Sequence, residues 1–395
     1  MASENYILTR ESLLRDIYIA YDDARRHKAK MPYVRCFERN LKANLESLCD
    51  DLFYRTYKPL PSLCFIVDEP KKREVFAAKF RDRIVHHLYY NYTHELFERT
   101  FITDSYSCIE GRGTHYGISR MKSHILKEGQ NYTVPCWVLK MDIRGYFIHI
   151  DRQLLSDIAV GVLYKMADHR VAKGGKRWRE IIDMDFAVWL TREIAMLDPK
   201  KDCERTGSID NWDNLDRSKS LFFAPDGCGL PIGNLTSQLF SNVYLNVLDQ
   251  WMKRELGCQH YGRYVDDFYV VSCDREWLLS LIPQVRTFLR DELHLNIHEG
   301  KTAVCDVRRG VEFLGAYVLP HRTYIANKSL QRMKEHVHAL DCRDAVRVCR
   351  SVNSWLGTLG HYNSYNIRCR LFAKYKPVTL CNLDMTKCLT FNKTK

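Results

Sequence analysis

The chain has 395 residues, of which 46% are hydrophobic and 27% are charged, and its net charge is +12 at pH 7. These values are ordinary for a soluble globular protein, and the length allows two or three lobes. No run of about 18 apolar residues occurs, and the first residues lack a basic-then-apolar secretory pattern, so we expect neither a membrane span nor secretion.

The cysteines and the net charge indicate the cellular compartment and the kind of binding partner. The fifteen cysteines are dispersed and form no Cys-x-x-Cys pattern. We therefore expect no structural zinc site, and we expect reduced thiols in a cytoplasmic protein. The basic balance favours a polyanionic partner, because binding to phosphates releases counterions, but a merely basic soluble protein fits the charge equally well.

The first half of the chain begins with predicted helices. Residues 1–50 have an amphipathic helical pattern with basic clusters, and residues 51–135 are rich in Arg, Lys and aromatic side chains. Residues 136–143 form an apolar run that predicts a buried strand, and Asp151 is a plausible N-cap for a following helix. Residues 169–228 are polar and partly irregular, so we interpret them as an insertion.

The second half of the chain alternates helices and strands. From Ser237 apolar side chains recur on one face, which predicts a helix. Residues 262–272 are typical of two short buried strands joined by a bend, and residues 312–319 predict a further strand. Beyond Pro320 the apolar spacing is helical again. This order predicts an α+β core followed by a helical C-terminal lobe.

The most informative residues are two adjacent acids, Asp266 and Asp267, at the bend within residues 262–272. Ionised carboxylates in a buried setting are costly unless a cation compensates them, and a divalent metal is the best candidate. Asp142 ends the strand predicted at 136–143 and is a candidate partner, because two-metal phosphoryl transfer needs carboxylates from separate elements. Strand-end aspartates also commonly cap the next element, so Asp142 alone does not distinguish a metal ligand from a capping residue.

Several motifs resemble those of reverse transcriptases. In chain order they are Lys71–Val75 and Phe80–His87 in the fingers, Met141–Phe147 as motif A, Gly229–Gln238 as motif B, Tyr264–Phe268 as motif C, His298–Thr302 as motif D and Phe313–Tyr317 as motif E. Together they extend from about residue 57 to residue 320. They are too many, and too well ordered, for chance agreement.

Motif B narrows the resemblance. It is most similar to the reverse transcriptases of diversity-generating retroelements, and enzymes of group II introns and phage-defence systems share much of it. Retroviral enzymes usually have Gln where Ile232 stands and Pro where Gln238 stands. The family's Gln contacts the sugar of the incoming nucleotide, and isoleucine cannot make that hydrogen bond. Lower copying fidelity is expected, unless Ile232 simply packs and fidelity is set elsewhere.

The resemblance also implies the catalytic residues. Asp142, Asp266 and Asp267 would be catalytic, and with the carbonyl of Ile143 they would bind two Mg²⁺ ions, for which Mn²⁺ is a possible substitute. Lys301 would donate a proton to the leaving pyrophosphate. The simpler alternative for Lys301 is a surface lysine on a loop.

A second set of residues would bind the nucleotide. Phe147 would be the steric gate that excludes a ribose 2′-hydroxyl, although a plain core aromatic is the alternative. Gly233 would allow close backbone approach to the template–nucleotide pair. Arg73 would grip the triphosphate bidentately. The complete set is Lys72, Arg73, Arg83, Phe147, Ile232, Gly233 and Gln238. Lys72 and Arg83 are the weaker candidates, since basic residues in this stretch could equally contact template phosphates.

The implied fold class is α+β, a right-hand polymerase. The predicted parts are an N-terminal helical extension at 1–50, fingers at 51–135, a palm at 136–320 with an insertion at about 169–228, and a helical thumb and tail at 321–395. The implied activity is RNA-directed DNA synthesis from dNTPs on a template RNA with a primer. A diversity-generating enzyme would also partner a small helical accessory protein.

Alternative functions remain at this stage. A phage-defence or group II intron-type reverse transcriptase has nearly the same motifs. An RNA-dependent RNA polymerase is disfavoured, because it typically has Gly-Asp-Asp at the hairpin and lacks an aromatic residue like Phe147. A non-catalytic RNA-binding scaffold is least favoured, because all three acids are intact.

Overall fold

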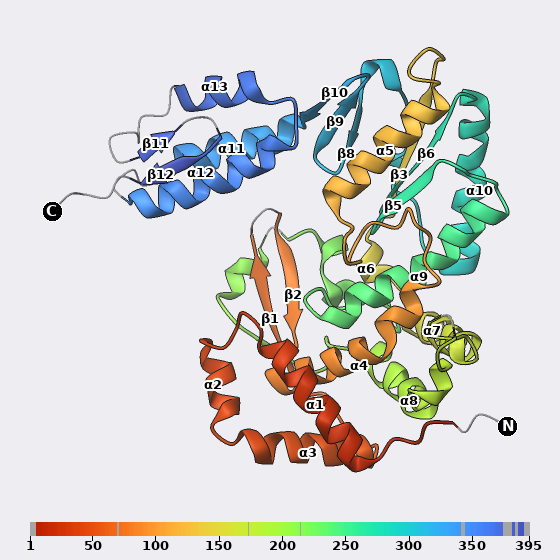
Figure 1. Ribbon diagram of the computed structural model, residues 1–395, viewed down its shortest axis with the longest axis vertical. Coiled ribbons are helices and arrows are strands. Elements are labelled where there is room, and N and C mark those ends of the chain that lie inside the picture. The colour runs from red at the N-terminus through yellow and green to blue at the C-terminus, as the bar shows by residue number, and fades with distance from the viewer. Residues whose placement is uncertain are drawn as a thin grey trace. The chain divides into compact units, whose positions relative to one another are not determined.

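A computed structural model describes residues 5–68, 71–172, 174–213, 215–340, 344–373, 381–383 and 386–390. The chain divides into two compact units. Unit 1 contains Met1–Ile109, Asp142–Gly257 and Pro283–Glu299, and unit 2 contains Glu110–Met141, Cys258–Ile282 and Gly300–Lys395. Both units combine helices with small sheets, so the predicted α+β class is confirmed (Figure 1). No helix in the described ranges is long and apolar enough to cross a membrane.

Unit 1 begins with the helices α1 (Arg10–Arg25), α2 (Pro32–Glu38) and α3 (Leu41–Phe53). Thr9 caps α1, since its hydroxyl accepts a hydrogen bond from the Ser12 amide and the Ser12 side chain bonds back. α1 packs against α3 and against α4 (Phe80–Glu98) through side chains at helical spacing, among them Leu13 and Ile17. The helical prediction for residues 1–50 is therefore confirmed.

A three-stranded sheet in unit 1 joins segments that are remote in sequence. β1 (Ser62–Val67) pairs antiparallel with β2 (Arg73–Ala77) and parallel with β4 (Cys203–Arg205), in the order β2-β1-β4. The predicted insertion thus contributes a strand to the sheet. It also contains α8 (Met184–Ala195), a buried helix that the sequence pattern did not reveal and that packs against α4 and α7 (Arg152–Ala167).

Two further helices of unit 1 follow the sequence prediction closely. Asp151 caps α7, because its carboxylate accepts a hydrogen bond from the Leu154 amide at 3.0 Å. The short helix α6 (Tyr146–His149) precedes it. α9 (Leu235–Arg254) begins two residues before the predicted Ser237 and packs against both α4 and α7. Its buried side chains surround most of the helix, so α9 is the central helix of the unit.

Unit 2 is built around a four-stranded sheet in the order β5-β6-β3-β7. These strands are β5 (Tyr261–Tyr264), β6 (Asp267–Ser272), β3 (Trp137–Asp142) and β7 (Ala303–Asp306). Helix α5 (Thr114–Glu128) packs on β5 and β6, as Figure 1 shows. α10 (Arg275–Leu293) lies between β6 and β7 in sequence. The predicted strand at 136–143 and the hairpin at 262–272 are both confirmed.

The strand predicted at 312–319 is wrong as a single strand. Two antiparallel strands occupy it, β8 (Val311–Phe313) and β9 (Ala316–Leu319), and β10 (Arg322–Ile325) completes a second sheet. The chain reverses at Leu314 and Gly315, whose φ angles are 50° and 80°. Gly315 adopts this conformation without cost. Leu314 gives no signal of a turn in the sequence, because leucine rarely has positive φ.

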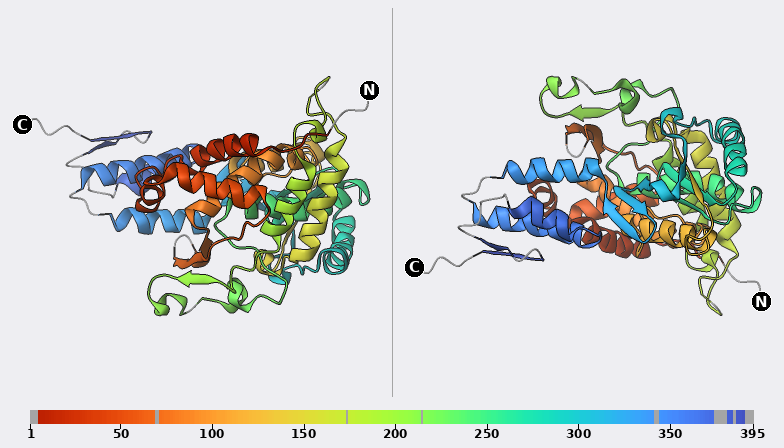
Figure 2. Two further views of the ribbon diagram at one scale, coloured as in Figure 1. Left: turned by 90° about the horizontal axis from the view of Figure 1, so that it is seen from below. Right: turned by 90° about the horizontal axis from the view of Figure 1, so that it is seen from above.

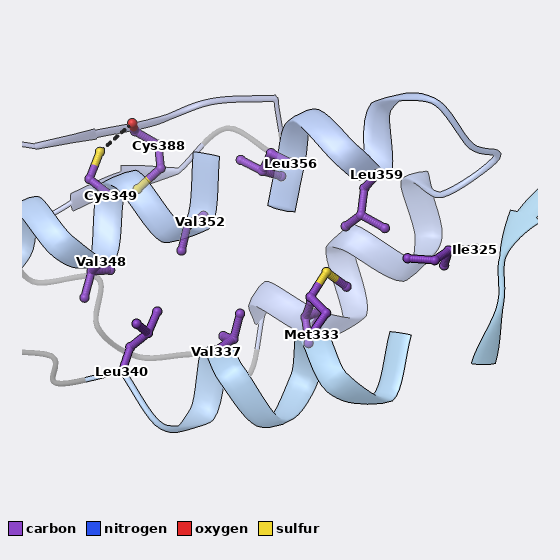
Figure 3. Packing of buried hydrophobic residues seen from close by; sticks show 11 residues of the cluster. Ile325, Met333, Val337, Leu340, Val348, Cys349, Val352, Leu356, Leu359 and Cys388 are labelled. Atoms are coloured by element: carbon purple, nitrogen blue, oxygen red, sulfur yellow. Dashed lines mark hydrogen bonds between the residues drawn. The ribbon is translucent and has the colours of Figure 1, made fainter. Parts of the chain in front are cut away.

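The C-terminal part of unit 2 is a helical lobe, as predicted. α11 (Asn327–His338) and α12 (Ala345–Gly360) lie side by side (Figure 2), followed by α13 (Tyr365–Ala373) and the hairpin of β11 (Cys381–Leu383) and β12 (Cys388–Thr390). Figure 3 shows the apolar core, to which Met333, Val337, Val352 and Leu356 contribute. Asn353 holds β12, because its side chain hydrogen-bonds both the amide and the carbonyl of Cys388. Predicted tail residues 391–395 lie outside the described ranges.

Candidate active site

The adjacent acids lie at the tip of the β5–β6 hairpin. β5 ends at Tyr264 and β6 begins at Asp267, and these two residues are cross-strand partners. The turn therefore consists of Val265 and Asp266. Both aspartates are half-buried. The structure thus brings two carboxylates together on a short, sharply bent segment, as the sequence predicted.

The backbone of this turn is strained. Val265 has a φ of 55°, in the left-handed region. Two-residue hairpin turns require positive φ and therefore usually contain Gly, Asn or Asp, whereas a β-branched residue there is an outlier. For a residue other than glycine the conformation costs about 1–2 kcal/mol. Surrounding contacts must therefore hold the turn in place.

Arg263 provides such a contact. Its side chain is 0% exposed, and its Nη1 atom donates a hydrogen bond to the Val265 carbonyl at 3.0 Å. We did not predict a role for this residue. The signal in the sequence was an arginine within a strand that was otherwise predicted to be buried. Burying a cationic side chain is costly, so its presence there indicates a specific interaction.

The base of the hairpin is fixed within unit 2. The hydroxyl of Tyr269 is 3.1 Å from Nδ1 of His124 on α5, and both side chains are buried. The ring of Tyr269 also packs edge to face against Phe313 of β8, with ring centroids 5.1 Å apart. The strand that carries Asp267 is thus held from both α5 and the second sheet.

Asp142 is the last residue of β3, the sheet neighbour of β6. Its carbonyl accepts a hydrogen bond from the His298 amide at 2.7 Å, and the Arg144 amide donates to the Asn296 carbonyl at 2.8 Å. These bonds lie on either side of Ile143, so the carbonyl of Ile143 takes no part in the bridge.

The donor set suits a hard divalent cation, since it consists of carboxylate and carbonyl oxygens. Within the described ranges, no three His, Cys, Asp or Glu side chains converge on a ready-made metal site. Mg²⁺ does not require one, because it is usually bound through one or two carboxylates together with substrate phosphates and water. That Asp142 meets Asp266 and Asp267 stays a prediction.

Motif A and motif B are linked within unit 1. The carbonyl of Phe147 accepts a hydrogen bond from the Leu230 amide at 2.7 Å, and Phe147 itself is half-buried. The hydroxyl of Tyr146 donates to the Ser241 carbonyl at 2.6 Å. These two bonds fix the candidate steric gate against the segment that leads into α9.

Motif B also contacts the strand that carries the candidate triphosphate-binding arginine. The Phe76 amide of β2 donates to the Ile232 carbonyl at 2.9 Å. Gly233 has a φ of 130°, and a Cβ atom there would lie 2.9 Å from the Phe76 carbonyl oxygen. Glycine is thus required for packing against β2, whatever it does toward a template. Gln238 is exposed on the first turns of α9.

The three basic candidates of the fingers differ in their surroundings. Arg73 begins β2 and is exposed. Nζ of Lys72 donates to the Asp213 carbonyl at 2.6 Å, so Lys72 ties the insertion to β2. Arg83 donates from Nε to the Ala78 carbonyl at 2.8 Å and stacks on Tyr33. Arg73 is therefore the best placed of the three to reach a phosphate. Lys301 is also exposed, in a short 3-10 turn before β7.

Glu74 is a second residue that we did not predict. It is 3% exposed, and its carboxylate accepts hydrogen bonds from Trp212 Nε1 at 2.9 Å, Ser220 Oγ at 3.0 Å and the Leu221 amide at 2.8 Å. All three donors belong to the insertion. Glu74 therefore fastens the insertion to the residue next to Arg73.

A buried histidine connects α4 to the start of α9. Nδ1 of His86 lies 2.8 Å from the hydroxyl of Thr236. Burial, together with the nearby charges of His87 and Arg83, lowers the pKa of His86 to about 4. The imidazole is thus neutral at pH 7, and its hydrogen bond positions motif B on α4.

Comparisons with known proteins agree with this arrangement. Residues 191–318 match the family described as reverse transcriptase (RNA-dependent DNA polymerase). Protein YkfC of Escherichia coli (strain K12) is 24% identical over 320 residues, covering 72% of this chain and 74% of the relative. Residues 191–318 are therefore similar to a reverse transcriptase domain, the domain type of RNA-dependent DNA polymerases. The matched segment includes motifs B to E, while Asp142 lies before it.

Solved telomerase structures align with most of the chain at low identity. Telomerase from Candida albicans, in complex with a fragment of telomeric RNA, aligns over 82% of this chain with a TM-score of 0.45 and 10% identity. Apo telomerase from Candida tropicalis aligns over 83% with a TM-score of 0.44 and 11% identity. The chain covers 57% and 62% of these two proteins, or about three fifths of their length.

Proposed function

We propose that the protein synthesises cDNA on a template RNA, extending a primer with dNTPs. The observation that carries this proposal is the adjacent pair Asp266 and Asp267 at a hairpin tip, inside the segment 191–318 that matches the reverse transcriptase family. An Asp-Asp hairpin without this match would suit many metal proteins. A match to the reverse transcriptase family without intact acids would instead indicate a non-catalytic RNA-binding scaffold.

Asp142, Asp266 and Asp267, with the carbonyl of Ile143, would hold two divalent cations, Mg²⁺ or in its place Mn²⁺. When bound, such ions activate the 3′-hydroxyl of the primer and neutralise charge on the departing pyrophosphate. The protein's own task is to orient the carboxylates. The proposal requires the end of β3 and the tip of the hairpin to share one edge of the sheet, whose neighbouring strands are about 4.8 Å apart.

The nucleotide would lie against the residues around motif B and the fingers. Exposed Arg73 would bind the triphosphate, with Lys72 and Arg83 as weaker candidates. Phe147 would exclude a ribose 2′-hydroxyl. Ile232, Gly233 and Gln238 would line the nucleotide and template side, and Lys301 would protonate pyrophosphate. The net charge of +12 supports binding of template RNA and primer.

We further propose that this is the error-prone enzyme of a diversity-generating retroelement, working with a small helical accessory protein. Ile232 supports this subtype, because a residue without a side-chain hydrogen bond stands in motif B. A phage-defence or group II intron-type enzyme is the second candidate. A neighbouring pair of repeats that differ mainly at adenines would favour the retroelement.

The activity is tested by dNTP incorporation on poly(rA)/oligo(dT), with template RNA and the accessory protein supplied. Asp266→Asn should lower incorporation by at least about 100-fold, because a metal-binding carboxylate is lost. Asp226→Asn is the matched control, since Asp226 is fully exposed and its ion pair with Lys200 is long, at 3.8 Å. Background signal from both the wild type and Asp266→Asn would contradict the proposal and favour an RNA-binding scaffold.

A further inference from the structure

The tip of the β5–β6 hairpin combines a strained backbone with a buried cation. Val265, which directly precedes the acids, has a φ of 55°, and valine has a strong preference for negative φ. The register places Arg263 opposite Phe268 and Tyr264 opposite Asp267, so the turn has only two residues. A change in the φ angle of one of them cannot be compensated by further turn residues. A relaxation at Val265 would therefore rotate the adjoining peptide and redirect the carboxylate of Asp266.

The side chain of Arg263 contacts this turn. Its guanidinium donates a hydrogen bond from Nη1 to the Val265 carbonyl at 3.0 Å. The side chain is completely buried. Hydrogen bonds from charged donors are stronger than neutral ones, and low dielectric strengthens them further. The contact therefore acts on the one peptide whose conformation valine disfavours.

Simple core filling does not explain an arginine at this position. Burying a guanidinium is costly, and an apolar side chain of similar length would usually fill the same volume with equal or greater stability. A specific conformational role is one reason for burying an ionic group.

We propose that Arg263 is a positioning residue, which holds the turn at Val265 in its left-handed conformation so that Asp266 and Asp267 face the reacting nucleotide. This inference rests on the proposed polymerase function. It predicts that the need for Arg263 depends on the residue at position 265. Glycine adopts positive φ without cost, so it should reduce the need for the arginine.

The experiment compares Arg263→Met with and without Val265→Gly. In the wild-type background, Arg263→Met should lower the rate of dNTP incorporation about tenfold or more, the loss expected for one charge-assisted hydrogen bond. With Val265→Gly present, the loss of rate caused by Arg263→Met should be at least threefold smaller. This factor corresponds to the part of the hydrogen bond's free energy that offsets the cost of positive φ at valine. The heat-denaturation midpoint should show the same coupling without any substrate or metal, because the strain belongs to the folded chain.

Arg152→Met is the matched control. Arg152 is also buried, but its partner is Asp198 at 3.0 Å, in unit 1. Val265→Gly should not reduce its effect on activity or on the denaturation midpoint. Arg263→Lys provides a second comparison if Arg263→Met does not fold. Lysine keeps the charge, but its side chain is shorter and lacks the planar set of donors of a guanidinium group.

The outcomes separate this inference from the function on which it rests. An active wild type with Arg263→Met equally active would overturn the inference and leave the polymerase intact. Equal losses from Arg263→Met in both backgrounds would also overturn it, since they indicate a general packing role. An inactive wild type, with template RNA and accessory protein present, would contradict the proposed function itself.

Discussion

At the scale of single residues, Ile232 offers the sharpest test of copying fidelity. Replacing it with Gln introduces a side chain that can hydrogen-bond a nucleotide sugar. One such bond contributes about 0.5–1.5 kcal/mol, so misincorporation on a homopolymeric RNA template should fall about two- to tenfold. The measurement is the ratio of wrong to correct dNTP incorporated.

Ile232→Leu is the control for this prediction, because it conserves the volume and adds no hydrogen-bonding group. The backbone carbonyl of Ile232 is bonded to the Phe76 amide, and neither substitution removes that bond. If Gln and Leu change fidelity equally, packing at this position sets the error rate and the hydrogen-bond argument is wrong.

Single residues also show where sequence reasoning succeeds and where it stops. The pair Asp266 and Asp267 could be predicted, because its apolar flanks and bend are local in sequence. Glu74 and Arg263 could not, because their importance comes from burial. The amide that Glu74 accepts from belongs to Leu221, 147 residues further along the chain. No local pattern reports such a contact.

At the scale of elements, Glu74 predicts how the insertion stays attached to β2. Glu74→Ala leaves three donors from the insertion without their acceptor, namely those of Trp212, Ser220 and Leu221. Unsatisfied buried donors cost about 1–3 kcal/mol each, and partial access of water should limit the loss in stability to about 2–4 kcal/mol. Limited proteolysis should cut faster between residues 203 and 221.

Glu204→Ala is the matched control on the same sheet. Glu204 lies on β4 and forms an ion pair with Lys79 at 2.6 Å, but its side chain is 55% exposed. Exposed pairs contribute about 0–1 kcal/mol, so this variant should be cleaved nearly as slowly as the wild type. Equal protection of Glu74→Ala would show that β4 pairing alone holds the insertion.

Elements were predictable where one residue signals a boundary. Asp151 marks the start of α7, and the apolar face of α9 fixes its identity, because caps and helical spacing are local properties. The β8–β9 turn was missed, because Leu314 adopts a conformation that leucine rarely has. α8 was missed because polar segments on both sides mask its twelve residues.

At the scale of the whole molecule, each unit is assembled from three separate stretches of chain. One boundary falls between Met141 and Asp142, inside motif A, and the Asp-Asp pair belongs to unit 2. The predicted fingers, palm and thumb are contiguous ranges, and composition alone could not reveal an interleaved arrangement.

The charge of the whole chain gives the last prediction. If the net charge of +12 serves to bind nucleic acid, affinity for an RNA template–DNA primer duplex should fall steeply with salt. For about six neutralised phosphates, the dissociation constant should rise roughly 1,000-fold between 50 mM and 200 mM salt. Fluorescence anisotropy of a labelled duplex measures this slope. Asp266→Asn should give the same slope with no incorporation, because that carboxylate neutralises no phosphate. An affinity that does not respond to salt would instead show that the basic charge is not a binding surface.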